Sequence, residues 1–180
     1  ARSNRSQQEA SAMNVKEAIQ SKRAVRQFAD KPVPEPDILA VLEAGRRSQS
    51  AKNTQPWRFI AIRDKARLKA LSETGQYAGH LAGAAFAIVF VSQRDDLWSY
   101  FDFGQAAAYM QLAGWELGIG SCIAAITDEA RARAILAVPD DRHIYVAISF
   151  GYPSPDFVPA KMGGRQPIEK LVHWDSWQER

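Results

Sequence analysis

Apolar residues recur along the chain with two different periods, and each period predicts one kind of secondary structure. Helical spacing of apolar residues predicts helices over 13–22, 37–45, 65–72, 100–117 and 128–136. Shorter runs rich in aromatic and β-branched residues predict strands over 57–62, 85–91 and 143–150, and a short apolar segment covers 121–126. Because strands and helices do not alternate strictly, this order favours a mixed-sheet α+β architecture.

Residues with special backbone preferences mark the ends of the predicted helices. Asn14 is a candidate N-cap for the first helix, and Asp37 leads the second. Gly118 is expected to end the long helix, because glycine readily adopts the left-handed conformation found at helix C-termini. Thr127 is expected to cap the helix that follows.

Three segments are too apolar to lie on a wet surface. The run 85–91 is almost continuously apolar, as in a strand that is buried on both faces. The helix over 100–117 carries almost no charge, which places it in a core or at a subunit interface. Beyond Gly151 the chain is irregular, yet it ends in an apolar segment with Trp174 and Trp177. We expect that segment to pack on this domain or on a second chain.

Length and composition narrow the class of protein. With 180 residues, 46% of them hydrophobic and 24% charged, the chain has the size of one globular domain, and a disordered or fibrous protein is excluded. Its single cysteine excludes an intramolecular disulfide. The polar residues 1–12 are expected to form a flexible leader before one domain over 13–180. No apolar run is long enough to cross a membrane, and we expect a cytoplasmic protein.

The small excess of positive charge gathers at two places. The 23 lysine and arginine residues face 20 aspartate and glutamate residues, so the formal net charge is +3. Basic residues cluster at 22–26 and again at Lys161 and Arg165, and are scattered elsewhere. Two small clusters suit a discrete anionic ligand such as a phosphate, whereas a nucleic-acid surface needs a continuous basic face. A basic nucleic-acid-binding module is therefore the less favoured alternative.

The familiar catalytic groups that a protein itself supplies are missing from the sequence. His80, His143 and His173 do not have the spacing of metal ligands, so no metal site is expected. Cys122 is predicted to be a buried, inert thiol. The segment 118–123 begins like a dinucleotide fingerprint, but Ile123 replaces the last glycine and a helix precedes it instead of a strand. The basic clusters therefore remain the main chemical feature of the chain.

A set of motifs in register resembles the nitroreductase family of FMN enzymes. The motifs are SKRAVRQF at 21–28, SAKNTQPW at 50–57, DFGQAA at 102–107, WELGIGSC at 115–122, GYP at 151–153 and RQP at 165–167. The resemblance covers about 14–177 and implies an α+β, nitroreductase-like fold with a mixed, mainly antiparallel sheet flanked by helices. It also implies an intertwined homodimer with FMN at two interface sites. The C-terminal arm, about 152–180, would wrap the partner.

The resemblance also implies which residues bind FMN. Lys22 would contact the phosphate and Arg26 the N1/O2 edge of the ring. Residues 50–53 would come from the other subunit, and 123–125 would lie along the ring. The complete set of implied cofactor-binding residues is Lys22, Arg23, Ala24, Arg26, Ser50, Ala51, Asn53, Ile123, Ala124, Ala125, Gly163 and Arg165.

Three positions depart from the family pattern. Ala24 stands in place of the usual serine, which removes a hydrogen bond worth about 0.5–1.5 kcal/mol. Gly163 stands where a second basic residue is common. Lys22 replaces a more usual arginine and offers a point charge in place of a fork. We therefore expect FMN to bind less tightly than is typical of the family.

An enzyme of this family would leave the redox chemistry to the flavin, while the protein supplies position and charge. Electrons would pass from NADH or NADPH to FMN, and then to a nitroaromatic, quinone or similar small acceptor, in ping-pong turnover without a catalytic residue from the protein. One alternative is a flavin enzyme of the same fold, of a desaturase or flavin-cleaving type, that does not use nicotinamide.

Two side-chain roles stay open at this point. His80 is either a hydrogen-bond donor to the pyrimidine edge of the flavin or an ordinary surface or core residue. Tyr100, Phe101 and Phe103 form either a lid over the ring or part of the core.

Overall fold

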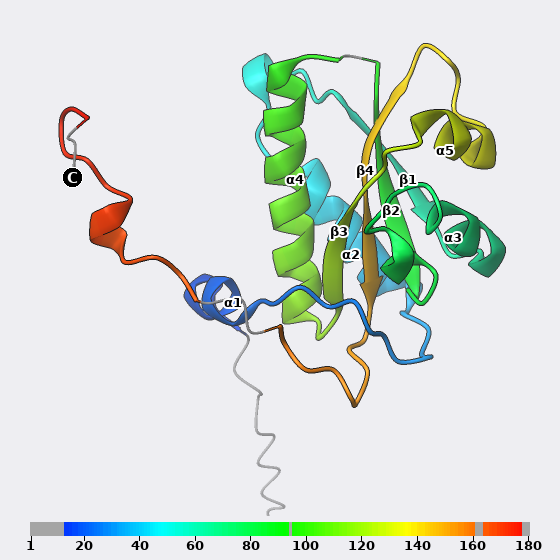
Figure 1. The fold of residues 1–180 in the computed structure, drawn as a ribbon, viewed down its shortest axis with the longest axis horizontal. Helices are drawn as coiled ribbons and strands as arrows, with labels where there is room; N and C mark the ends of the chain where they lie inside the picture. The colour runs from blue at the N-terminus through cyan, green and yellow to red at the C-terminus, as the bar shows by residue number, and fades with distance from the viewer. Residues whose placement is uncertain (1–12, 94, 161–163, 178–180) are drawn as a thin grey trace, which may run out of the picture.

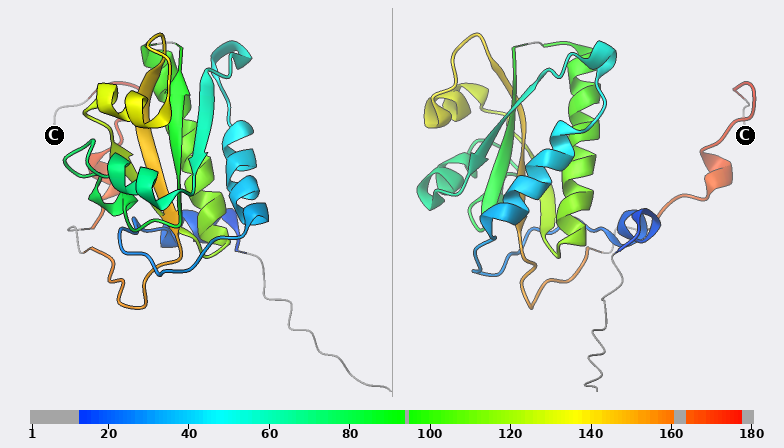
Figure 2. Two further views of the ribbon diagram at one scale, coloured as in Figure 1. Left: turned by 90° about the vertical axis from the view of Figure 1, so that its right-hand side faces the viewer. Right: turned by 180° about the vertical axis from the view of Figure 1, so that it is seen from behind.

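A four-stranded sheet lies between two layers of helices in the computed structural model, which describes residues 13–93, 95–160 and 164–177 (Figure 1). The strands are β1 (Trp57–Ile62), β2 (Phe86–Ser92), β3 (Gly120–Ala125) and β4 (His143–Gly151), in the order β1-β2-β4-β3 with every pair antiparallel. Helices α2 (Glu35–Arg46) and α4 (Leu97–Glu116) cover one face (Figure 2). Helices α3 (Lys65–Leu71) and α5 (Glu129–Leu136) cover the other, and α1 (Val15–Ser21) lies near the C-terminal end of α4.

Strand β2 joins the two helical layers, because successive side chains of a strand point to opposite faces. All seven of its residues are buried. Phe86 and Ile88 belong to the hydrophobic cluster beneath α2 and α4, whereas Ala87 and Val89 belong to the cluster beneath α3 and α5. The prediction of a strand buried on both faces is confirmed.

Helix α4 is only half buried. It begins at Leu97, earlier than predicted, because the side chain of Asp96 accepts a hydrogen bond from the Ser99 amide at 2.8 Å and caps the helix. One face packs closely on α2, where a Cβ at Gly45 would lie 2.1 Å from Met110 Cε. The opposite face leaves large apolar side chains exposed, namely Leu97, Trp98, Phe101 and Tyr109. None of the described helices combines the length and apolar character that a membrane crossing requires.

The predicted helix ends are partly confirmed. Asn14 caps α1 through a reciprocal pair of hydrogen bonds with Glu17. Helix α2 begins at Glu35 and not at Asp37, because proline is well tolerated in the first turn of a helix. Thr127 was the wrong cap for α5: Asp128 accepts the capping hydrogen bond, and the Thr127 hydroxyl donates to the Thr74 carbonyl at 3.3 Å.

The last described part of the C-terminal arm, residues 164–177, does not pack on its own domain. Residues 164–177 extend away from the sheet and its helices, with one short 3-10 turn at Ile168–Lys170 (Figures 1 and 2). Their large apolar side chains are between 60% and 80% exposed, namely Ile168, Leu171, Trp174 and Trp177. The sequence predicts that this segment packs either on its own domain or on a second chain. The structure contradicts the first possibility, and the second stays a prediction.

Candidate functional site

The basic segment that follows α1 lies along the outer edge of strand β3. Ala24 forms a parallel bridge with Ser121, and the Val25 amide donates to the Ser121 carbonyl at 3.0 Å. A side chain at position 120 has no room, because its Cβ would lie 2.5 Å from Val25 Cγ2. Gly120 therefore allows two backbone segments to pack closely, and Gly118, with φ of 74°, ends α4 as predicted.

This contact gathers three cations of the first motif in one place. Arg23 donates to the carbonyls of Gln20 and Lys22 at 2.8 and 2.9 Å, so its guanidinium caps the end of α1. Lys22 is half-buried and Arg26 is exposed. Burial lowers the pKa of the Lys22 ammonium. Within the described residues, no carboxylate forms an ion pair with any of the three, so the positive charge there is uncompensated.

Cys122 lies beside this basic segment but is not activated by it. Burial raises the pKa of its thiol, and the charges of Arg26 and Lys22 oppose that effect only in part. The residue is 4% exposed. The prediction of a buried, inert thiol is confirmed.

His80 brings a ring nitrogen to the same place. Its Nδ1 lies 2.8 Å from Ser149 Oγ, and the same hydroxyl oxygen lies 3.2 Å from the Cys122 carbonyl oxygen. Either tautomer of the ring satisfies the contact with Ser149, because Nδ1 can donate to the hydroxyl or accept from it. Nε2 is buried without a hydrogen-bond partner among the described residues. Burial, followed by the nearby charge of Arg26, lowers the pKa of His80, and the backbone of Ile123 opposes this only in part.

The second group of implied cofactor residues, 50–53, forms a strained turn beside the N-terminal part of α4. The Ala51 amide donates at 3.0 Å to a carboxylate oxygen of Asp102, which is buried in α4. Lys52 and Asn53 have φ of 52° and 54°, a left-handed conformation that is costly for residues other than glycine. Strain of this kind is concentrated at ligand-binding sites. Asp102, which holds the turn, lies in the DFGQAA motif, but the motif alone did not indicate this contact.

Within one chain the two groups lie at opposite ends of α4 (Figure 1). Trp115 Nε1 donates to Ser21 Oγ at 2.9 Å and fixes the end of α1 beside the last turn of α4. Asp102 holds 50–53 near the first turns. The helix from Asp102 to Trp115 is roughly 20 Å long at about 1.5 Å per residue. A single chain therefore does not bring both groups to one small ligand.

The remaining implied residues are only partly available. Ile123 and Ala125 are exposed on β3, but the side chain of Ala124 is fully buried in the core, so only its backbone can face a ligand. Arg165 is exposed near the start of the segment 164–177, and no described contact links it to the other cations. Gly163 lies outside the described residues.

The aromatic residues of α4 divide between core and surface. Phe103 is 3% exposed and packs edge-on against Phe90 and Tyr145, so it belongs to the core and not to a lid. Tyr100 and Phe101 are 51% and 62% exposed and remain available to a ligand or a partner. In the part of the chain that the structure describes, no group of three His, Cys, Asp or Glu residues is placed to hold a metal ion.

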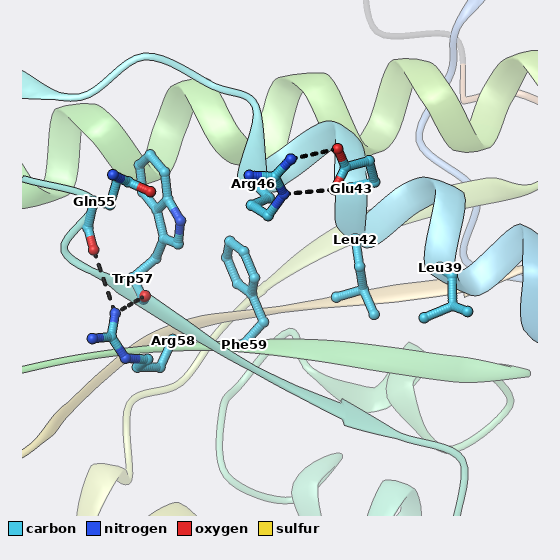
Figure 3. Close-up of a pocket in the computed structure, with 8 residues that line it drawn as sticks. All are labelled: Leu39, Leu42, Glu43, Arg46, Gln55, Trp57, Arg58 and Phe59. Atoms are coloured by element: carbon cyan, nitrogen blue, oxygen red, sulfur yellow. Dashed lines mark hydrogen bonds and ion pairs between the residues drawn. The ribbon is translucent and has the colours of Figure 1, made fainter. Parts of the chain in front are cut away.

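An apolar groove lies at the opposite edge of the sheet, between α2 and β1 (Figure 3). It has a volume of about 600 Å³ and is lined by Leu39, Leu42, Glu43, Arg46, Gln55, Trp57, Arg58 and Phe59. The Arg46–Glu43 ion pair, at 2.6 Å, closes one side. The groove follows β1, an edge strand whose outer backbone groups have no neighbouring strand within the described sheet.

Comparison with known proteins gives the same family as the motifs. The nitroreductase family model matches residues 19–76 and 71–152. A Thermus thermophilus protein named NADH dehydrogenase is 28% identical over a match that covers 90% of this chain and 96% of its own. An Archaeoglobus fulgidus protein, whose name pairs NADH dehydrogenase with NAD(P)H nitroreductase, is 32% identical over 77% of this chain and 84% of its own.

A solved structure extends this agreement to the fold. The structure of an FMN-dependent nitroreductase from Clostridium difficile matches with a TM-score of 0.79 at 27% identity, over 89% of this chain and 98% of that one. The predicted α+β, nitroreductase-like fold is therefore confirmed. With a family model that matches most of its length, a relative at 32% identity and this shared architecture, the chain belongs to the nitroreductase family.

Proposed function

We propose that the protein is an FMN-dependent oxidoreductase that takes electrons from NADH or NADPH and passes them to a nitroaromatic, quinone or similar small acceptor. The observation that carries this proposal is a group of polar side chains at the edge of β3, which we call the cradle: Lys22, Arg26 and His80. Lys22 and Arg26 lie there without a carboxylate partner in the described chain, next to the buried, unpartnered Nε2 of His80. A ligand with a phosphate at one end and a polar ring at the other fits these groups.

Each residue of the cradle has a binding or electrostatic role in this proposal. FMN, when bound, supplies the hydride and electron transfer. Lys22 would pair with the phosphate, whose negative charge offsets the burial that lowers the pKa of the ammonium. Arg26 would hold positive charge where the ring gains electron density, which favours its reduction. His80, held by Ser149, would offer its Nε2 atom to a polar edge of the ring.

We infer that the working unit is a homodimer. Residues 50–53 lie at the far end of α4 from the cradle, so only a second chain can bring that turn to it. The exposed aromatic side chains of α4 and of the arm supply apolar surface for a partner to cover. The groove between α2 and β1 offers the arm of the second chain an apolar surface beside an unpaired strand edge (Figure 3).

The proposal is tested by visible spectroscopy of the purified protein. We expect added FMN to bind, NADH or NADPH to bleach its absorbance without oxygen, and a nitroaromatic or a quinone to restore it. Initial rates with both substrates varied should give the parallel lines of ping-pong turnover. Arg26→Ala should lose FMN, and the matched control Arg63→Ala should keep it, because Arg63 pairs with Glu35 away from the cradle.

Two other results would change the assignment. A protein that takes up no FMN contradicts the proposal. A protein that binds FMN, but whose flavin neither nicotinamide reduces, is the alternative enzyme that works without a nicotinamide donor.

A further inference from the structure

A polar hollow lies where the ends of three strands meet, away from the cradle at β3. It has a volume of about 280 Å³ and is lined by Thr54, Gln55, Pro56, Arg58, Ser92, Gln93 and Arg142. Ser92 at the end of β2 pairs with Trp57 at the start of β1 and with His143 at the start of β4. Among the described residues, the lining contains two guanidinium groups, two hydroxyls and two side-chain amides, and no carboxylate.

The two guanidinium groups are weakly compensated. Arg58 is held by its Nη1, which donates to the carbonyls of Trp57 at 2.8 Å and Gln55 at 3.4 Å (Figure 3). It forms no ion pair with the described carboxylates, and its other N–H groups have no partner there. Arg142 approaches Asp141 only at 3.7 Å, beyond hydrogen-bond length. An anion in the hollow would therefore meet two positive charges, of which only that of Arg142 has a carboxylate nearby.

The hollow also adjoins a part of the proposed active site. Thr54 and Gln55, which line it, directly follow the strained turn 50–53. In the proposed dimer that turn reaches the cradle of the partner. The hollow would therefore lie beside the partner's cradle in that dimer.

We propose that the hollow is a subsite for a phosphate monoester, and that the 2′-phosphate of NADPH is the group it receives. The planar guanidinium of arginine donates two parallel hydrogen bonds to a pair of phosphate oxygens. A phosphate monoester carries about −1.5 to −2 charges at neutral pH. In dinucleotide-binding folds a carboxylate binds the ribose hydroxyls of NADH, and none is present among the described residues that line the hollow. The enzyme then prefers NADPH to NADH. This inference rests on the proposed function, because it takes a nicotinamide donor as given.

The test compares phosphate-bearing and phosphate-free ligands of the FMN-loaded enzyme. We expect calorimetry to show 2′,5′-ADP binding at least about tenfold more tightly than 5′-AMP, the difference that one charge-assisted contact supplies. The double variant Arg58→Gln/Arg142→Gln should lose that difference. Its KM for NADPH should rise about 10-fold to 100-fold, while its KM for NADH and its kcat change little.

Two further variants keep the test independent of folding. Arg142→Gln alone spares the backbone contacts of Arg58 and should raise the KM for NADPH in the same direction by a smaller factor. Arg63→Gln removes an exposed arginine outside the hollow and should leave both KM values unchanged.

The outcomes separate this inference from the proposed function. An enzyme that uses NADH and NADPH equally well, before and after the double substitution, overturns the inference and leaves the proposed function intact. If neither nicotinamide reduces the flavin, the proposed function is wrong. In that case the hollow remains a phosphate-monoester subsite only if 2′,5′-ADP binds and the double variant abolishes that binding. Inorganic phosphate that binds as tightly as 2′,5′-ADP overturns the assignment to a nucleotide.

Discussion

Lys22 carries a positive charge that the protein itself does not balance. Its ammonium is half-buried, burial lowers its pKa, and no described carboxylate pairs with it. Lys22→Ala should therefore weaken FMN binding about 10-fold to 100-fold, the range for losing a hydrogen bond to a charged group. Lys22→Arg should bind FMN at least as tightly as the wild type, because a guanidinium fork matches phosphate better than an ammonium.

Quenching of flavin fluorescence during titration measures both affinities. Lys16→Ala removes an exposed lysine from the same helix and serves as the control. Equal affinity in the wild type and Lys22→Ala would show that Lys22 does not meet the phosphate.

His80 should make the stability of the cofactor-free protein depend on pH. Burial and Arg26 lower its pKa in the folded state below its ordinary value of about 6.5, so the unfolded chain takes up a proton at higher pH than the folded one. The contribution of His80 to the free energy of unfolding is complete above about pH 6.5, and is lost as the pH falls through the folded pKa. Urea denaturation at a series of pH values from about 7.5 to 5.5 measures this slope.

His80→Gln removes the titrating ring and should flatten the slope. A slope that survives in His80→Gln would mean that another group causes the pH dependence.

At the level of single residues, the sequence identified what is local and missed what is distant. Lys22 and Arg26 are close in the chain and follow a predicted helix, so a basic cluster could be read directly. The orientation of His80 depends on Ser149, which belongs to a distant strand, and no spacing rule predicts that pair. Ala124 was assigned to the ring as part of a consecutive trio, but the alternation of a strand places its side chain in the core.

Among the elements, hydrophobic periodicity was the reliable guide and polar chemistry was not. Strand β2 and helix α4 were predicted because burial on one or two faces leaves its pattern in the sequence. Thr127 and Asp128 are neighbours that both suit an N-cap, and only the tertiary hydrogen bond from Thr127 to Thr74 decides between them. The left-handed turn at Lys52 has no signal in the sequence, because Asp102 imposes it from another element.

The turn 50–53 should become more stable when its backbone strain is removed. Lys52 has φ of 52°, a conformation that costs an L-residue about 1–2 kcal/mol and costs glycine nothing. Glycine also gains freedom in the unfolded chain, and this offsets part of the relief of strain. Lys52→Gly should therefore raise the free energy of unfolding by a net amount of about 0.5–1 kcal/mol. Chemical denaturation of the cofactor-free protein measures the change.

Lys69→Gly provides the matched comparison, because Lys69 lies inside α3 with ordinary helical geometry. It should lower the free energy of unfolding by about 0.5–1 kcal/mol. If Lys52→Gly is destabilising by a similar amount, the turn does not hold Lys52 in the left-handed region.

The molecule as a whole has the size of one domain and leaves large apolar side chains exposed outside its core. Its hydrophobic clusters are complete within one chain, yet one face of α4 and the arm leave tryptophan and phenylalanine side chains exposed. The two groups of implied cofactor residues lie at opposite ends of α4. Composition predicted the single domain, and the resemblance and the apolar segments predicted a second copy. The separation of the two groups along α4 is the structural observation that supports a second copy.

A complementation experiment tests whether each site is built from two chains. Arg26→Ala should disable the cradle, and Asn53→Ala should disable the turn that the partner contributes, so each variant alone should bind FMN poorly. In a mixed dimer, one site combines both defects, while the other combines the intact cradle of one chain with the intact turn of the other. Co-expression in equal amounts should therefore restore FMN to about a quarter of all sites.

Two affinity tags allow the mixed dimer to be isolated, and its flavin absorbance should then correspond to one FMN per two chains. Mixing Arg26→Ala with Lys22→Ala provides the control, because both changes lie in the cradle of their own chain and leave no intact site in the mixed dimer. Restoration only in the first mixture requires that a chain's cradle works with the turn of its partner. Failure of both mixtures, with dimers present, would place 22–26 and 50–53 in the same chain's site, against the separation that α4 imposes.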